Sequence, residues 1–188
     1  MVATDSGGFT VGSERTVHEW AMFRLLQRNV TSPTGEEFER TFVDTPGAVA
    51  TVAITPRGDI VLVSQYRAAM GRFVLEIPAG MRDVAGEDPA VTATRELREE
   101  TGYVASSVEI LGEFLSTPGV TNSHLFVYLA TGLEPGDSEP HGPEEDSMSV
   151  TEVPAAEALA MVRNGRIVDG KTSYAILMAH LARPDLFG

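Results

Sequence analysis

Three glutamates within five residues are the part of this sequence best suited to chemistry. Glu96, Glu99 and Glu100 are three and four residues apart, so a helix places their carboxylates on one face. Like charges at this spacing destabilise a helix by about 0.2–0.5 kcal/mol per pair. Bound Mg²⁺ or Mn²⁺ would remove the repulsion, because both ions prefer clustered carboxylate oxygens. The alternative is a solvated glutamate-rich face, the usual meaning of a charge run, and the helix alone does not separate the two.

The neighbouring residues predict the helix that positions these carboxylates. Asp88 suits the N-cap, Pro89 suits the first helical position, and Gly102 suits the left-handed residue that ends a helix. Arg95 and Arg98 are expected to project at other angles and to relieve only part of the repulsion. An apolar stripe that would face a core is formed by Ala90, Val91, Ala93, Thr94 and Leu97.

The stretch FVLEIP, residues 73–78, predicts a strand that delivers Ala79 and Gly80 to the region before this helix. A glycine there lets the backbone approach a ligand closely. Glu76 lies in the middle of the strand. It is either a buried partner for an arginine or a contact for a substrate, and the sequence does not choose between them.

Composition bounds the class of protein. The chain has 188 residues, 43% of them hydrophobic, which fits one globular, soluble domain with a sizeable core. We expect no membrane span and no signal peptide, because no apolar run is long enough and the first ten residues are polar. The absence of cysteine excludes disulfides, zinc–thiolate sites and cysteine nucleophiles, and fits a cytoplasmic protein. A net charge of −13 argues against binding to nucleic acid or anionic membranes.

The rest of the chain predicts mainly strands, with two helices near its end. Residues 1–12 are expected to be a mobile tail, followed by strands up to Thr45. Two β-rich runs, 47–54 and 59–67, are predicted to form a hairpin around the turn TPRG. Strands are also predicted within 108–119 and 125–133. The last helix, 171–182, should turn an apolar stripe of Ile176, Leu177 and Leu181 toward the core.

One stretch of the sequence resembles the signature of a known family, the Nudix hydrolases, which cleave nucleoside diphosphates linked to another moiety. The matching positions are Gly80, Glu87, Arg95, Glu96, Leu97, Glu99, Glu100 and Gly102. The family pattern has five residues between its first glycine and first glutamate, whereas six separate Gly80 from Glu87. This insertion lies in the loop before the helix, and every fixed position of the helical half matches.

The resemblance implies a fold and a metal site. The fold is an α/β/α sandwich with a mixed central sheet and an additional N-terminal antiparallel sheet. Residues 1–45 would form the tail and β-sheet subdomain, and 46–188 the hydrolase domain. Two or three Mg²⁺ ions, or Mn²⁺ in their place, would be held by Glu96, Glu100 and Glu99 with the carbonyl of Ala79. Gly80, Glu87, Arg95 and Gly102 would hold this motif in shape.

Two further features resemble the ADP-ribose pyrophosphatase branch of the family. Gln65-Tyr66-Arg67 resembles a QYR segment whose arginine contacts substrate phosphate, although Arg67 could equally form a surface ion pair with Glu76. Pro118 follows Gly102 by sixteen positions, as in that branch. Residues 120–124 depart from the acidic loop common in bacterial members, which puts the identity of the substrate in doubt.

The same branch implies a homodimer that shares the N-terminal sheet. Trp20 and Phe23 would then be candidates to stack on an adenine, although as residue types they are more often core or interface aromatics. In relatives, a glutamate on the loop matching residues 134–147 acts as the base that activates water or as a further metal ligand. Glu145 is the first choice here and Glu144 the second, against the alternative of a solvated acidic loop.

Taken together, these features predict Mg²⁺-dependent hydrolysis of ADP-ribose to AMP and ribose 5-phosphate. Glu145, Glu144 and Glu100 would be the catalytic residues, and Arg67, Glu76, Trp20 and Pro118 the substrate contacts. One alternative is hydrolysis of another nucleoside diphosphate derivative, such as a nucleotide sugar, NADH or a dinucleoside polyphosphate. Others are a non-catalytic domain that senses ADP-ribose and an acidic protein with only a structural role.

Overall fold

A computed structural model describes residues 6–139 and 146–188 of the chain. Its contacts divide the chain into two units, Met1–Gly47 with Thr117–Ser123, and Ala48–Ser116 with His124–Gly188. In chain order the elements, with η marking a 3₁₀ helix, are β1 (Thr10–Trp20), β2 (Phe23–Thr31), β3 (Glu37–Asp44), β4 (Ala48–Ala53), β5 (Asp59–Arg67), η1 (Ala68–Met70), β6 (Arg72–Glu76), β7 (Ala79–Met81), α1 (Pro89–Thr101), β8 (Tyr103–Leu115), β9 (His124–Pro135), β10 (Ser149–Pro154), α3 (Ala155–Arg163), α4 (Gly170–Ala182) and η2 (Pro184–Phe187).

The first unit is a three-stranded antiparallel sheet in the order β1-β2-β3. β1 begins at Thr10, so the expected tail of residues 1–12 is too long. Pairing of Thr10 with Thr31 extends the strand into a stretch whose Gly/Ser/Thr composition looks unstructured. The segment 117–123 belongs to this unit, because the Val43 N–H donates to the Val120 carbonyl at 2.8 Å.

The second unit is built on two sheets. One is mixed, in the order β7-β4-β9-β8, since β4 runs parallel to β9 and antiparallel to β7. The other is antiparallel, in the order β10-β5-β6. The expected hairpin between 47–54 and 59–67 is wrong in one respect. Gly58 N–H donates to the Thr55 carbonyl at 2.9 Å to close a tight turn, but β4 and β5 then diverge into different sheets. Both strands are buried on both faces, so packing selects their neighbours.

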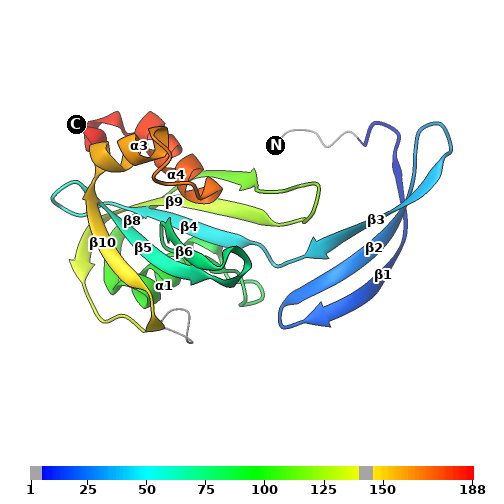
Figure 1. Ribbon diagram of the computed structural model, residues 1–188, viewed down its shortest axis with the longest axis horizontal. Coiled ribbons are helices and arrows are strands. Elements are labelled where there is room, and N and C mark those ends of the chain that lie inside the picture. Colours follow the sequence, from blue (N-terminus) through cyan, green and yellow to red (C-terminus); the bar gives the residue numbers. More distant parts are fainter. Residues whose placement is uncertain (1–5, 140–145) are drawn as a thin grey trace. The chain divides into compact units, whose positions relative to one another are not determined.

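Helices cover both sides of these sheets, with α1 on one side and α3 and α4 on the other (Figure 1). The largest core cluster joins strand residues such as Leu62 and Leu129 to Ile176 of α4. Leu97 of α1 is fully buried in a separate cluster with Val61 and Leu133. This mixed α/β layering, together with the separate antiparallel sheet of the first unit, is the fold class expected from the sequence.

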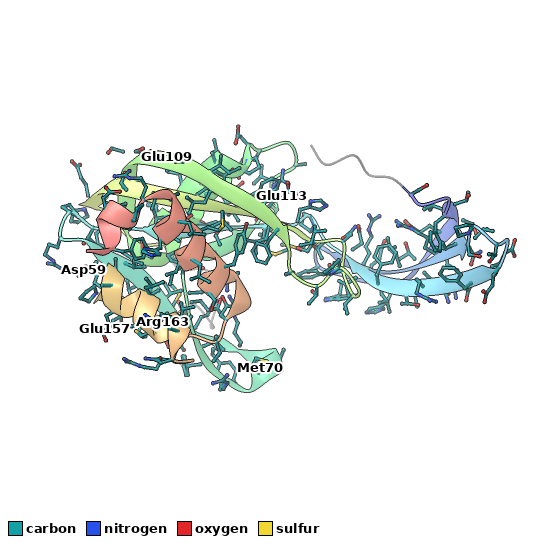
Figure 2. The ribbon with its side chains drawn as sticks, turned by 90° about the horizontal axis from the view of Figure 1, so that it is seen from above. Asp59, Met70, Glu109, Glu113, Glu157 and Arg163 are labelled. Carbon is teal, nitrogen blue, oxygen red and sulfur yellow. The ribbon has the colours of Figure 1, made fainter. Side chains whose placement is uncertain are left out.

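The apolar stripe predicted for the last helix is only partly right. Ile176 is buried together with Ala175 and Ala179, but Leu177 and Leu181 are 42% and 74% exposed. Apolar residues of α4 itself lie on all of its faces, so the sequence did not show which face meets the core. α3 separates its faces more clearly, and Figure 2 shows Glu157 and Arg163 on its outer side.

Within residues 6–139 and 146–188, no helix is long and apolar enough to cross a membrane.

Candidate metal and diphosphate site

α1 carries the three glutamates and begins and ends where the sequence predicts. The Asp88 carboxylate accepts the N–H of Ala90 at 2.8 Å, Pro89 is the first helical residue, and Gly102 ends the helix with φ at 74°. Leu97 is buried beneath the helix and fixes which face it turns away from solvent.

The three glutamates line one pocket of about 450 Å³. Residues from the end of β5, from β7 and the loop after it, and from α1 form its wall: Gln65, Arg67, Ala79, Gly80, Met81, Asp83, Arg95, Glu96, Glu99 and Glu100. The fold therefore brings the expected metal ligands together with Arg67, which comes from a different sheet. Asp83 and Gln65 also reach the pocket, and sequence reasoning assigned neither of them to the site. Asp83 lies in the loop outside the fixed positions of the motif, and in the QYR segment only the arginine was given a role.

Gly80 is required by the close approach of a carboxylate. A Cβ atom built on Gly80 would lie 2.0 Å from Cδ of Glu96, far inside van der Waals contact. Only a glycine lets the side chain of Glu96 lie against the backbone of β7 at this point. Gly80 therefore shapes the site through the space that it leaves free.

Glu100 is fixed to the same strand by a hydrogen bond. Its Oε2 accepts the backbone N–H of Ala79 at 3.0 Å, and the residue is only 6% exposed. This bond ties the end of α1 to β7. The carboxylate of Glu100 and the peptide group of Ala79 are consequently held next to each other on the pocket wall.

Arg95 also turns toward these carboxylates, which corrects the expectation that it projects elsewhere. Its NH1 lies 2.8 Å from Glu96 and 3.1 Å from Glu99. Its NH2 lies 3.0 Å from Asp83 and 3.4 Å from Glu87. Desolvation alone would lower the pKa of Arg95, but these four carboxylates outweigh it and raise the pKa.

The negative charge around Arg95 exceeds what one guanidinium balances. Burial raises the pKa of Glu96 to about 7, and repulsion from Glu99 and Asp83 adds to the rise, although Arg95 opposes it. A carboxylate whose pKa is raised in this way is stabilised by any additional cation.

The donor set expected from the sequence, carboxylate oxygens with the Ala79 carbonyl, would suit a hard divalent cation such as Mg²⁺ or Mn²⁺. Although these carboxylates line one pocket, within the described part of the chain no group of three or more Asp, Glu or His residues is close enough to hold a metal ion. The guanidinium of Arg95 bridges Glu96 and Glu99 instead. The raised pKa of Glu96 favours the arrival of a further positive charge.

Arg67 forms an ion pair and also lines the pocket. Its Nε and NH2 donate to the two carboxylate oxygens of Glu76 at 2.8 and 2.6 Å. The side chain of Glu76 is 3% exposed and that of Arg67 is 37% exposed. The structure thus contains the ion pair that the sequence offered as one alternative, and its partner is buried rather than at the surface.

The other residues singled out in the sequence lie elsewhere. Glu87 accepts the hydroxyl of the buried Thr92 at 2.8 Å, which braces the start of α1. Trp20 and Pro118 belong to the first unit, where the Trp20 ring stacks between those of His18 and Phe23. Glu144 and Glu145 lie outside the described residues.

The sequence is similar to several characterised proteins. Residues 44–171, more than half of the chain, match the NUDIX domain family. An ADP-ribose pyrophosphatase of Mycobacterium tuberculosis is 44% identical over 91% of this chain and 82% of its own length. A methanol dehydrogenase activator of Bacillus methanolicus is 40% identical, and an ADP-ribose pyrophosphatase of Bacillus subtilis is 38% identical; each match covers 81% of this chain and 82% of the relative.

The fold is similar to that of a solved structure as well. A protein described as an ADP compounds hydrolase superposes with a TM-score of 0.83 over 94% of this chain and 95% of its own, at 21% identity. At that identity the likeness concerns the fold.

Proposed function

Because the chain belongs to the Nudix family, we propose that it hydrolyses the diphosphate bond of ADP-ribose to AMP and ribose 5-phosphate. The observation that carries the proposal is a pocket in which three glutamates of α1 face Arg67 of β5. A diphosphate needs cationic partners, and this chain carries a net charge of −13. The pocket supplies carboxylates for metal ions and, in Arg67, an arginine for the phosphates. The two ADP-ribose pyrophosphatases among its relatives support the choice of substrate.

In the proposed enzyme, Glu96, Glu99 and Glu100 would hold two or three Mg²⁺ ions together with the Ala79 carbonyl. Such ions would neutralise the diphosphate and lower the pKa of the attacking water. Gly80 keeps the space in which the side chain of Glu96 lies. The N–H of Ala79 keeps Glu100 in place.

Arg67 binds the diphosphate in this proposal, because a guanidinium offers paired donors to phosphate oxygens. A glutamate of the loop after β9, Glu145 or otherwise Glu144, takes the proton of the attacking water. The new P–O bond forms as the bond to the leaving phosphate breaks. The charge on the leaving phosphate is stabilised by Arg67.

The first unit would contribute to substrate binding and assembly. We propose that Trp20 stacks on the adenine, that Pro118 shapes the loop beside the distal ribose phosphate, and that the β1-β2-β3 sheet joins two copies of the chain.

The proposed assembly is supported by the exposure of the first strand. Every residue of β1 is exposed, including Val11, Val17 and Trp20. Light scattering at micromolar concentration should give twice the chain mass of 20.1 kDa, and a monomer would overturn the assembly.

The function is tested by product analysis with purified protein, Mg²⁺ and a panel of ADP-ribose, GDP-mannose, NADH and diadenosine polyphosphates. We expect AMP and ribose 5-phosphate to form much faster from ADP-ribose than products form from the other compounds. Faster turnover of another compound would keep the catalytic helix but overturn the proposed substrate. Tight binding of ADP-ribose with Mg²⁺ and no turnover would instead indicate a sensor.

A further inference from the structure

Lys171 is the only lysine in the chain, and the other strongly basic side chains are all arginines. It lies in the first turn of α4, and its side chain is only 15% exposed. A lysine is seldom this buried unless it is paired. Nothing in the Nudix motif, and nothing in the function proposed above, makes use of it.

The ammonium of Lys171 bridges two carboxylates. Its Nζ donates to Oε2 of Glu76, on β6, and to Oδ2 of Asp169 at 3.0 Å. Asp169 is itself fixed as the N-cap of α4, because its carboxylate accepts the N–H and the hydroxyl of Thr172 at 2.9 and 2.6 Å. The Thr172 hydroxyl oxygen accepts the N–H of Ile77 at 3.0 Å, which ties the helix to the residue after β6.

The far side of Glu76 leads to the pocket. Its two oxygens accept the paired N–H groups of Arg67, and Arg67 forms part of the pocket wall. The charges therefore alternate from the pocket inward: Arg67, Glu76, Lys171, Asp169. Glu76 contacts both cations, and its Oε2 is shared between them.

This arrangement decides how Glu76 acts on Arg67. Burial alone would raise the pKa of Glu76, but Arg67 and Lys171 together lower it, so the carboxylate stays ionised. A buried carboxylate with Arg67 as its only partner would place its whole charge on that guanidinium and compete with a phosphate for it. Lys171 takes up part of that charge, and Asp169 holds the ammonium in position.

We propose that Lys171 is a positioning residue for the diphosphate, which holds Glu76 and, through it, the guanidinium of Arg67 at the pocket wall without touching the substrate. The inference rests on the proposed function, because it assigns Arg67 to the phosphate. It adds a specific role for α4, a helix from the opposite side of the sheets to the catalytic helix (Figure 1).

The first experiment compares Lys171→Met and Lys171→Arg with wild type in steady-state hydrolysis of ADP-ribose. For Lys171→Met we expect kcat/KM to fall by about 10-fold to 100-fold, the size of effect that a displacement of about 1 Å causes. KM should rise because Arg67 binds the diphosphate, and kcat should fall because Arg67 also stabilises the leaving phosphate. Lys171→Arg keeps the charge, so its KM should lie close to the wild-type value. Arg183→Met is the matched control, because it also removes one cation, from the surface pair with Asp185, and should leave KM unchanged.

A purely structural role gives a different pattern. Lys171→Met would then lower the melting temperature and the active fraction, and so the apparent kcat, with KM as in wild type. That result, or a Lys171→Arg protein with the KM of Lys171→Met, would overturn the proposal.

A second measurement does not depend on turnover. Protein labelled with ¹³C at lysine Cε gives one side-chain NMR signal, since Lys171 is the only lysine. The proposal expects Arg67→Met to shift this signal without any ligand, and ADP-ribose added in EDTA to shift it in wild type. An unchanged signal in Arg67→Met would overturn the positioning role. If the signal responds to Arg67→Met but the wild type hydrolyses no ADP-ribose, the proposed function fails while the coupling between Lys171 and Arg67 stands.

Discussion

Two charge networks differ in their balance, one along the wall of the pocket and one that reaches the pocket through Arg67. Around α1, one guanidinium, that of Arg95, faces four carboxylates. Between β5, β6 and α4, two cations share two carboxylates. The central glutamates of the two networks, Glu96 and Glu76, are both shielded from water, with side chains 15% and 3% exposed. The difference between them therefore arises from which charges are their neighbours.

The pKa values of the two central glutamates show the consequence. Burial would raise the pKa of both. Glu96, with too few cations, reaches about 7, whereas the pKa of Glu76 is lowered by Arg67 and Lys171. A cluster with more carboxylates than cations favours the binding of a further cation. A cluster with equal numbers of the two holds its side chains in place. This contrast supports the two proposals made above, metal binding at α1 and positioning on the β5–β6–α4 side.

The greatest loss of catalysis is expected in Glu100→Gln. The amide keeps the shape and can still accept the N–H of Ala79, but it supplies no charge to a metal ion. We expect kcat with saturating Mg²⁺ to fall by about 10²–10³-fold, with stability close to that of wild type. Glu109→Gln is the control, an exposed glutamate on β8 (labelled in Figure 2). Full activity in Glu100→Gln would show that this cluster is not the metal site.

The next effect is an unusual pH dependence of stability without metal. Because the folded pKa of Glu96 lies above its ordinary value, its contribution to stability is complete below about pH 4.5 and is lost as the pH rises through about 7. In EDTA, the free energy of unfolding of Glu96→Gln should therefore increase relative to that of wild type between pH 5 and pH 8, by up to about 3 kcal/mol. Urea unfolding at the two pH values measures the gain.

The balanced network should behave in the opposite way. Desolvation would raise the pKa of Asp169, but Lys171 and Thr172 outweigh it and lower the pKa. Its contribution to stability is present above its ordinary pKa of about 4 and is lost as the pH falls below that value. Asp169→Asn should be less stable than wild type at pH 7, with the deficit shrinking on acidification. The stability of Asp169→Asn relative to wild type should thus fall with rising pH, whereas that of Glu96→Gln should rise. If both change in the same direction, the two networks do not differ in their charge balance.

A smaller effect is expected from Gly80→Ala. The added methyl meets Glu96 at 2.0 Å, and the flexible end of that side chain must move away. We expect kcat/KM for the diphosphate substrate to fall by about 10-fold or more, with little change in melting temperature. Gly170→Ala serves as the control, because nothing lies within 4 Å of the added atom. Equal activities of the two variants would mean that the position of Glu96 is not critical.

The mildest change is expected from Asp83→Asn. The side chain of Asp83 is 46% exposed, and its pair with Arg95 at 3.0 Å is therefore screened by water. Exposed pairs contribute about 0.2–1 kcal/mol, so the free energy of unfolding should change by about 0.5 kcal/mol or less. Chemical denaturation measures it. A loss well above 1 kcal/mol would show that the carboxylates around Arg95 form a structural network rather than a site with surplus charge.

Features that depend on neighbours along the chain could be predicted from the sequence alone. The cap at Asp88, the end at Gly102 and the shared face of Glu96, Glu99 and Glu100 follow from helix geometry and residue type, and the structure shows each of them. The fold class followed from the resemblance of one fixed motif to a known family, and the strand and helix patterns are consistent with it.

Contacts between distant segments, in contrast, became visible only in the folded chain. Lys171 reaches Glu76 across 95 positions of the sequence, and no local pattern encodes that pairing. The direction of Arg95, the parting of β4 from β5 and the buried face of α4 were likewise set by packing. Local rules fix a residue's backbone and the face it occupies. Which side chain meets it there depends on how sheets and helices pack. In this protein that packing decides which carboxylates are balanced by cations and which carry surplus negative charge.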